Sequence, residues 1–149
     1  MLRWLLAFLH LLAFGIGFGS IVIRAQALSD LPDTASLKRA LRADNWWGIA
    51  ALLWLGTGLP RLLMGTEKPE QYYLANHLFW AKMGLFILVV LLEIGPATAL
   101  MRWRVALARK REPDLGAAPR WALISRIELV LLLILVMVAT AMARGYGEP

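Results

Sequence analysis

The sequence contains no cysteine and only two histidines among its 149 residues. Disulfides, iron–sulfur clusters and thiolate zinc sites are therefore excluded, which leaves histidine, methionine, lysine and carboxylates as candidate metal ligands. Charged residues make up only 17% of the chain, whereas 60% of it is hydrophobic. This apolar content exceeds that of ordinary soluble domains and indicates an integral membrane protein, with a single domain over residues 1–149.

The alternation of apolar and polar residues that is typical of strands is also missing. The apolar residues instead form four runs of about 20 residues, and each is long enough to cross the ~30 Å hydrocarbon layer as a helix. An open sheet in lipid would leave its edge hydrogen bonds unmade. The sequence therefore predicts an all-α membrane protein, a bundle of four transmembrane helices with spans at about residues 4–23, 46–63, 77–101 and 121–143.

The segment after the first span could hold a signal-peptide cleavage site or a short helix. Residues 25–27 loosely resemble a signal-peptide cleavage site, but Arg24 precedes them and the apolar run is long, so we expect the first span to remain as an anchor. Residues 34–42 place leucine and alanine on one face among basic side chains, which predicts a short interfacial helix between the first two spans. Asp44 or Asn45 is then expected to cap the second span.

Lysine and arginine are unevenly distributed over the predicted loops. The segments after the first and third spans carry ten of them, whereas the other side of the membrane has four. By the positive-inside rule, both chain termini should lie on the non-cytoplasmic side. The net charge of +6 is explained by this topology and by lipid headgroups, so the lipid bilayer is the expected partner and nucleic acid is not.

Two ionisable residues lie inside the outer half of the predicted bundle. At ~1.5 Å per residue, His10 of the first span and Lys82 of the third have similar depths below the outer boundary. Charged groups in lipid are costly, so we expect both to face a common cavity, with Trp54 or Arg61 of the second span on its wall. The ordinary alternatives are an interhelical hydrogen bond for His10, a snorkelling Lys82, core packing for Trp54, and pairing of Arg61 with Glu67 or a lipid phosphate.

A second polar cluster is expected toward the cytoplasmic side, where Glu93 in the third span meets Arg126 and Glu128 in the fourth. We expect Glu93 and Arg126 to form an ion pair between these spans. Because breaking a buried pair is costly, this cluster favours a structural clamp over a reaction centre.

Gly15 and Gly19 form a G-x-x-x-G pair inside the first span. Small residues at this spacing let a second helix approach closely, either within the bundle or in a homo-oligomer. The surrounding glycine run is not a nucleotide-binding loop, because it lies inside an apolar span with no preceding strand.

Several short motifs occur together: Leu9-His10, Arg42-Ala43-Asp44-Asn45-Trp46-Trp47-Gly48, Ala75-Asn76-His77-Leu78-Phe79-Trp80-Ala81-Lys82-Met83, Glu93-x-x-Pro96 and Trp103-Arg104. In combination they resemble the bacterial membrane family called domain of unknown function 2214, over nearly the whole chain. This resemblance implies a multi-pass protein of the bacterial cytoplasmic (inner) membrane and implies no activity.

A second, more remote resemblance rests on His10 and on Trp80-Ala81-Lys82. These residues are similar to motifs of the oxygen-independent protoporphyrinogen oxidases, small membrane proteins that associate with haem and depend on a histidine and a lysine in those spans. The resemblance implies functional roles for His10 and Lys82. The Leu-Pro-Arg motif of that family follows the first span, whereas Leu59-Pro60-Arg61 here follows the second.

The most specific functional hypothesis is that the bundle binds haem b or another porphyrin and has a redox role. His10 would ligate the iron, Lys82 would be a second ligand or a catalytic proton-transfer group, Arg61 would hold a propionate, and Trp54 would pack on the ring. His77 lies at the membrane boundary, so ligation by two histidines is not expected.

Two hypotheses from other classes remain open, and the sequence leaves undecided whether the protein is an enzyme. In one, the protein is a noncatalytic accessory or assembly factor whose polar residues only lock helices together. In the other it handles copper, because thioethers and imidazole suit Cu(I) and the residues Met64, Met83, Met142 and His10 could gather on the outer side.

Overall fold

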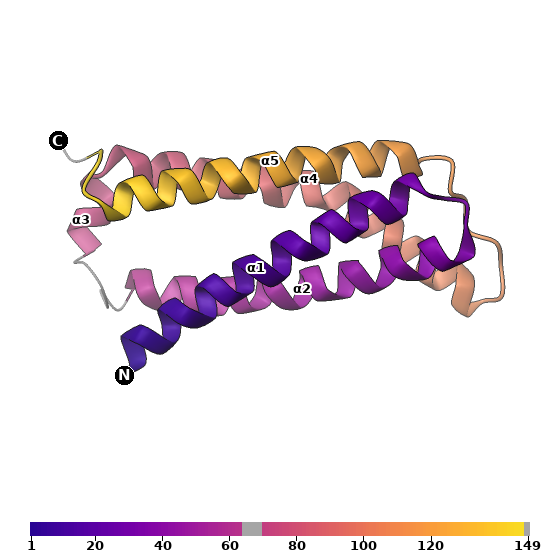
Figure 1. Ribbon diagram of the computed structural model, residues 1–149, viewed down its shortest axis with the longest axis horizontal. Coiled ribbons are helices and arrows are strands. Elements are labelled where there is room, and N and C mark those ends of the chain that lie inside the picture. Colours follow the sequence, from indigo (N-terminus) through magenta and orange to yellow (C-terminus); the bar gives the residue numbers. More distant parts are fainter. Residues whose placement is uncertain (64–69, 148–149) are drawn as a thin grey trace.

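The computed structural model describes residues 1–63 and 70–147, and its regular structure over them is helical. The helices are α1 (Leu2–Ser29), α2 (Thr34–Leu63), the short α3 (Glu70–Ala75), α4 (His77–Ala108) and α5 (Ala118–Ala143). The long helices form two antiparallel hairpins, α1 with α2 and α4 with α5 (Figure 1). Helix α1 joins the hairpins, because it packs against α5 as well as α2.

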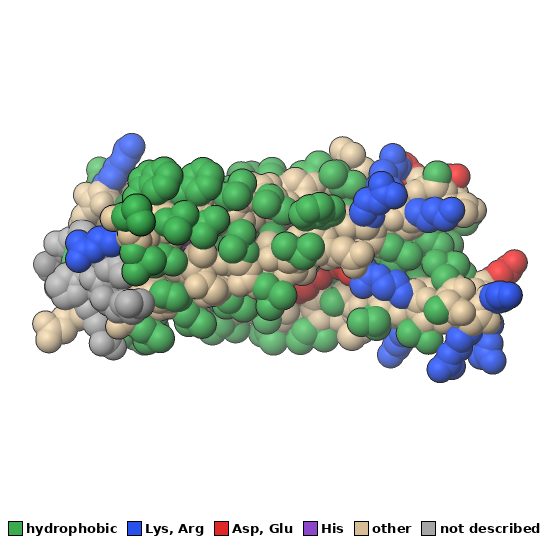
Figure 2. Space-filling view, turned by 90° about the horizontal axis from the view of Figure 1, so that it is seen from below, with side chains coloured by type: hydrophobic (Ala, Val, Ile, Leu, Met, Phe, Trp, Pro, Cys, Tyr) green, Lys and Arg blue, Asp and Glu red, His purple; other side chains and the backbone are tan. Residues whose placement is uncertain are grey.

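The two ends of the bundle differ in what they carry. Helix α3 and both chain termini lie at one end, here called the terminal end, whereas the α1–α2 and α4–α5 connections lie at the other, the connection end (Figure 1). On the face shown in Figure 2, Lys and Arg gather at the connection end and apolar side chains cover the middle. As predicted, the two chain termini lie at one end of the bundle and the basic connections lie at the other.

Among the described residues, helices α1, α4 and α5 are long and apolar enough to cross a membrane. Large apolar side chains on all three are exposed, for example Leu11, Leu91 and Leu133. An apolar surface of this extent is unfavourable in water and suits a lipid environment. The first, third and fourth predicted spans thus correspond to helices, each of which extends beyond the predicted bounds.

Helix α2 differs from its prediction. Residues 34–42 do not form a separate interfacial helix, because α2 runs from Thr34 through the predicted second span to Leu63. The N-cap is Asp33, whose carboxylate accepts a hydrogen bond from the Ser36 amide at 2.8 Å. The hydrogen bonds from Ser36 lower the pKa of Asp33 below its usual value. Asp44 lies inside the helix, where two guanidinium groups bind its carboxylate.

Helices α1 and α2 pack tightly against each other at Gly17. A Cβ atom at this position would lie 2.9 Å from the Trp47 ring, so only glycine fits there without a shift. Gly15 and Gly19 have no such neighbour within 4 Å. Their predicted role in packing within the bundle is therefore wrong, and a role between two copies of the chain stays a prediction.

Asn76 closes the terminal end of the α4–α5 hairpin. Its side chain accepts a hydrogen bond from the Leu78 amide and donates one to the Tyr146 carbonyl, while the His77 amide donates to the Gly147 carbonyl. These bonds hold the last described residues against the start of α4. They fix the start of α4 beside the cavity described next.

Candidate functional site

A cavity of about 520 Å³ lies between the two hairpins toward the terminal end. All five helices contribute to its wall, which is mostly aliphatic and aromatic. His10, Trp54, Arg61 and Lys82 all line it. The common cavity predicted for His10 and Lys82 is therefore present, with both proposed wall residues.

His10 is held by α2. Its Nδ1 atom is 2.9 Å from Thr57 Oγ1, and that hydroxyl is 2.7 Å from the Leu53 carbonyl oxygen. This hydrogen bond between Nδ1 and Oγ1 joins α1 to α2 and orients the imidazole ring. Gly58 makes room for the ring, since a Cβ atom there would lie 3.1 Å from His10 Cε1. The interhelical hydrogen bond that was the ordinary alternative for His10 is thus formed.

Trp54 is the centre of an aromatic wall. Its ring centroid lies 5.7 Å from that of His10, 6.2 Å from Phe14 and 6.0 Å from Phe86. Its Nε1 atom is buried and has no hydrogen-bond partner within the described chain. An unmade hydrogen bond of this kind costs about 1–3 kcal/mol. The Trp54 ring therefore borders the cavity, whereas its Nε1 donor is itself buried.

Two cationic side chains border the same cavity. Lys82 is half-buried, and its ammonium group lies 5.3 Å from the centroid of the Phe79 ring, a cation–π distance. Arg61 follows Pro60 near the end of α2. The positive charge of Lys82 in a mostly apolar wall favours a ligand that brings an acidic group of its own.

The cavity has little else that could hold a metal ion. Met83 and Met142 line it, while Met64 and Glu67 lie outside the described residues. No cluster of three or more histidine and carboxylate side chains suited to a metal is present in the described part of the chain. Metal binding there would depend on His10 with thioethers, or on a cofactor that brings its own ligands.

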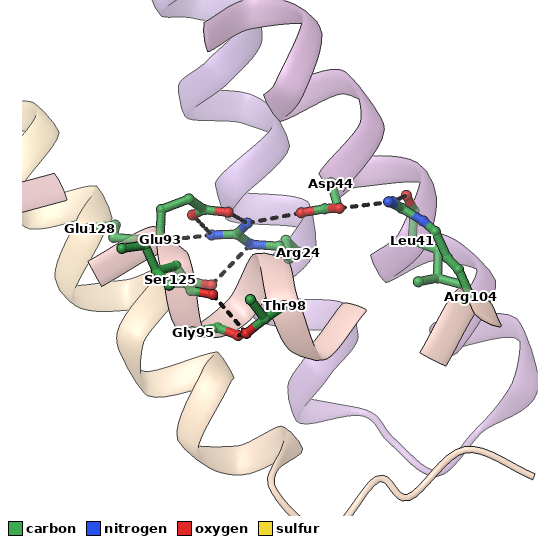
Figure 3. A network of polar contacts seen from close by, with 10 residues as sticks. Arg24, Leu41, Asp44, Glu93, Gly95, Thr98, Arg104, Ser125 and Glu128 are labelled. Atoms are coloured by element: carbon green, nitrogen blue, oxygen red, sulfur yellow. Dashed lines mark hydrogen bonds and ion pairs between the residues drawn. The ribbon is translucent and has the colours of Figure 1, made fainter. Parts of the chain in front are cut away.

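A second site lies nearer the connection end, around the fully buried Arg24 of α1 (Figure 3). Its Nη1 and Nη2 atoms donate to the two oxygens of Glu93, at 2.6 and 2.7 Å. Nη2 also donates to Glu128 at 2.7 Å, Nη1 to Asp44 at 3.3 Å, and Nε to Ser125 at 3.1 Å. A guanidinium group has five N–H donors, so every one of them has an acceptor.

Arg104 extends this network to the far side of Asp44. It donates at 2.8 Å to the Asp44 carboxylate and at 2.8 Å to the Leu41 carbonyl (Figure 3). The charged groups come from α1, α2, α4 and α5. The Arg24 network, meaning Arg24, Asp44, Glu93, Arg104, Ser125 and Glu128, therefore ties all four long helices together.

A family model described as "Predicted membrane protein (DUF2214)" matches residues 2–147. This chain belongs to the DUF2214 family. The match covers all five helices and confirms the first resemblance drawn from the motifs. Searches among curated proteins and among solved structures gave no match, so the resemblance to the oxygen-independent protoporphyrinogen oxidases is not supported.

In this DUF2214 protein the predicted pair between Glu93 and Arg126 is wrong. Glu93 binds Arg24 through both oxygens, and the exposed Arg126 donates to the Ser29 hydroxyl at 2.9 Å. Glu128 does lie beside Glu93, as expected. The loop-charge count places Arg24 just after the first span, whereas α1 continues to Ser29 and so contains Arg24.

A signal for Arg24 was present in the sequence. His10, Phe14, Gly17, Ser20 and Arg24 follow one another at helical spacing and form a single stripe. This stripe predicts a polar face that points into the bundle, where Arg24 does lie, but it does not reveal that Glu93 is the partner of Arg24. Asp44 gave no such signal, because its place before two tryptophans is typical of a helix cap.

Proposed function

We propose that this DUF2214 protein binds an apolar ligand with acidic groups in the cavity at its terminal end, and that haem or another porphyrin is that ligand. The observation that best supports this proposal is the meeting of His10, Trp54, Arg61 and Lys82 on one mostly apolar wall. The cavity volume of about 520 Å³ lies within the range of small-molecule sites, roughly 300–1,000 Å³.

Each of the four residues has a role suited to its chemistry. Arg61 and Lys82 would bind the acidic groups, since ammonium and guanidinium ions form strong hydrogen bonds to carboxylates. Trp54 would pack against the ring. His10 would ligate the iron of haem through Nε2, with Thr57 fixing the ring as an outer partner.

A bound haem would supply one-electron redox chemistry. The contribution of the chain is to exclude water, to orient the ring and to hold charge next to it. Lys82 is the candidate for a second ligand or for proton transfer, because its ammonium group borders the cavity in a mostly apolar setting.

We also propose that α2 crosses the membrane, which gives four spans. Helix α2 runs antiparallel to α1 and packs along it, so a bilayer that contains α1 would contain α2 as well. Arg61 then lies at one boundary, and the polar part of α2 before Asn45 projects toward the other. By the positive-inside rule, the connection end faces the cytoplasm of a bacterial cell.

Absorption spectroscopy of the detergent-purified protein tests the ligand. After addition of haem, the wild type should show a Soret band, which His10→Ala should lose without a change in helical content by circular dichroism. His77→Ala is the matched control, because His77 is the other histidine of the chain, is exposed and does not line the cavity. A wild type that stays colourless with haem, or a band that His10→Ala leaves unchanged, would contradict iron ligation by His10.

The same cavity permits copper handling as a second function, because Met83 and Met142 line it beside His10. A titration with Cu(I) separates the two. Tight Cu(I) binding that Met83→Leu weakens, together with no porphyrin binding, would replace the porphyrin proposal. A protein that binds neither would have the accessory role in which the Arg24 network only locks the helices.

A further inference from the structure

The Arg24 network contains more acidic than basic groups. Two guanidinium ions, Arg24 and Arg104, meet three carboxyl groups, Asp44, Glu93 and Glu128. If all were ionised, the network would carry one excess negative charge. Arg24 and Glu128 are fully buried, and an uncompensated charge in such a place costs several kcal/mol.

No further cation within the described residues balances this charge. The groups that face Glu128 are Arg24 from α1 and Glu93 from α4, with Asp44 of α2 on the other side of Arg24. Arg126, two residues before Glu128, turns outward to Ser29. Excess charge at a buried site is most readily removed by a proton.

The three carboxyl groups differ in how well the network satisfies them. Asp44 binds both arginines, one with each oxygen. Glu93 binds Arg24 with both oxygens. Glu128 binds only through Oε2, and its Oε1 atom is buried with no hydrogen-bond partner in the described chain. Protonation therefore costs least at Glu128.

Glu93 and Glu128 are also neighbours. Their Oε2 atoms accept from the same nitrogen of Arg24, each at 2.7 Å. Two carboxylates that share one site repel each other, so the second proton to leave is held strongly. We infer that Glu128 is a proton-binding site inside the membrane: its carboxyl group carries a proton at neutral pH and holds it beside the Glu93 carboxylate. The proton comes from water, and the network as a whole is then neutral.

Infrared spectroscopy of the protein in lipid tests this inference, because a protonated carboxyl group has a C=O stretching band that shifts in D₂O. At pH 7 the wild type should show this band and Glu128→Gln should lack it. Glu112→Gln is the matched control, since Glu112 is an exposed residue of the α4–α5 connection. The band should remain in that variant.

Variants that change the charge count separate proton binding from a purely structural role. Glu93→Gln and Asp44→Asn each remove one negative charge, so the band of Glu128 should disappear although Glu128 is still present. A band that persists in Glu128→Gln, or that these two variants leave unchanged, would overturn the inference.

If the variants do not fold, the wild type alone still tests whether Glu128 is protonated at neutral pH. The band should be present at pH 7, whereas a band that appears only below about pH 5, as for an ordinary glutamate, would overturn the inference. The band should also be insensitive to sodium chloride. Its loss on addition of sodium would make the site a cation site instead and overturn the assignment to a proton.

Discussion

At the scale of single residues, Arg24 shows what a charge inside a membrane protein requires. It is fully buried, and its five N–H donors reach three carboxyl groups and a hydroxyl on three other helices. Lysine could supply the charge but not the fork of donors that binds two oxygens of Glu93 at once. The site is therefore specific for arginine.

Replacing Arg24 with leucine should destabilise the protein strongly. The change leaves buried carboxyl groups without their cation, and loss of one partner of a buried pair costs about 3–5 kcal/mol. Thermal unfolding in detergent, followed by circular dichroism, measures this loss. Arg126→Leu is the control, because Arg126 is exposed and makes one hydrogen bond, to Ser29. Equal losses in the two variants would contradict the assigned role of Arg24.

For single residues, the sequence predicts how deep a side chain lies along the bundle better than it predicts which side chain that residue contacts. The matched depth of His10 and Lys82 follows from the rise of a helix, and the cavity that they share is present. The partner of Glu93 depends on how each helix is rotated about its own axis, and on α1 extending past its apolar run. The spacing of residues along one helix contains neither kind of information, so it predicts Arg126 instead of Arg24 as the partner of Glu93.

At the scale of elements, α2 is longer and more continuous than its sequence indicates. The change from basic to apolar residues near Asp44 predicts a boundary between an interfacial helix and a span. In the structure the helix continues, because Arg24 and Arg104 bind the Asp44 carboxylate and it does not compete for the backbone. Asp33, several residues earlier, takes the capping role.

The Asp33 cap gives a prediction about pH. Since its pKa is lower in the folded protein than its ordinary value, its stabilising effect is present above that ordinary value and is lost as the pH falls through the folded value. Asp33→Ala should thus lower the melting temperature at pH 7, and the gap to the wild type should narrow toward pH 3. Asp33→Asn, which keeps a capping oxygen, should be nearer the wild type at pH 7. A gap that widens as the pH falls would contradict the assigned cap.

At the scale of the whole molecule, the two ends of the bundle have different roles. Near the connection end the Arg24 network ties both hairpins together, whereas toward the terminal end the hairpins enclose the cavity between them. A clamp at one end and a cavity at the other allow a ligand to be held without interrupting the polar contacts that join the helices.

The absence of cysteine allows the membrane topology to be tested with single introduced cysteines. Asp30→Cys and Glu112→Cys lie in the two connections, and Gln71→Cys lies in α3. With a maleimide that does not cross membranes, applied to intact cells, only Gln71→Cys should be labelled. After the cells are opened, all three should react. Labelling of Asp30→Cys and Gln71→Cys from the same side would show that α2 does not span the membrane.

Native mass spectrometry of the protein extracted directly from its own membrane tests the central claim most directly, because it weighs whatever occupies the cavity without a choice of ligand beforehand. We expect a complex heavier than the chain by the mass of one haem or porphyrin. This added mass should be lost in a variant that combines His10→Ala with Lys82→Met and kept in His77→Ala. A protein that carries only lipids, equally in all three forms, would contradict the proposed function.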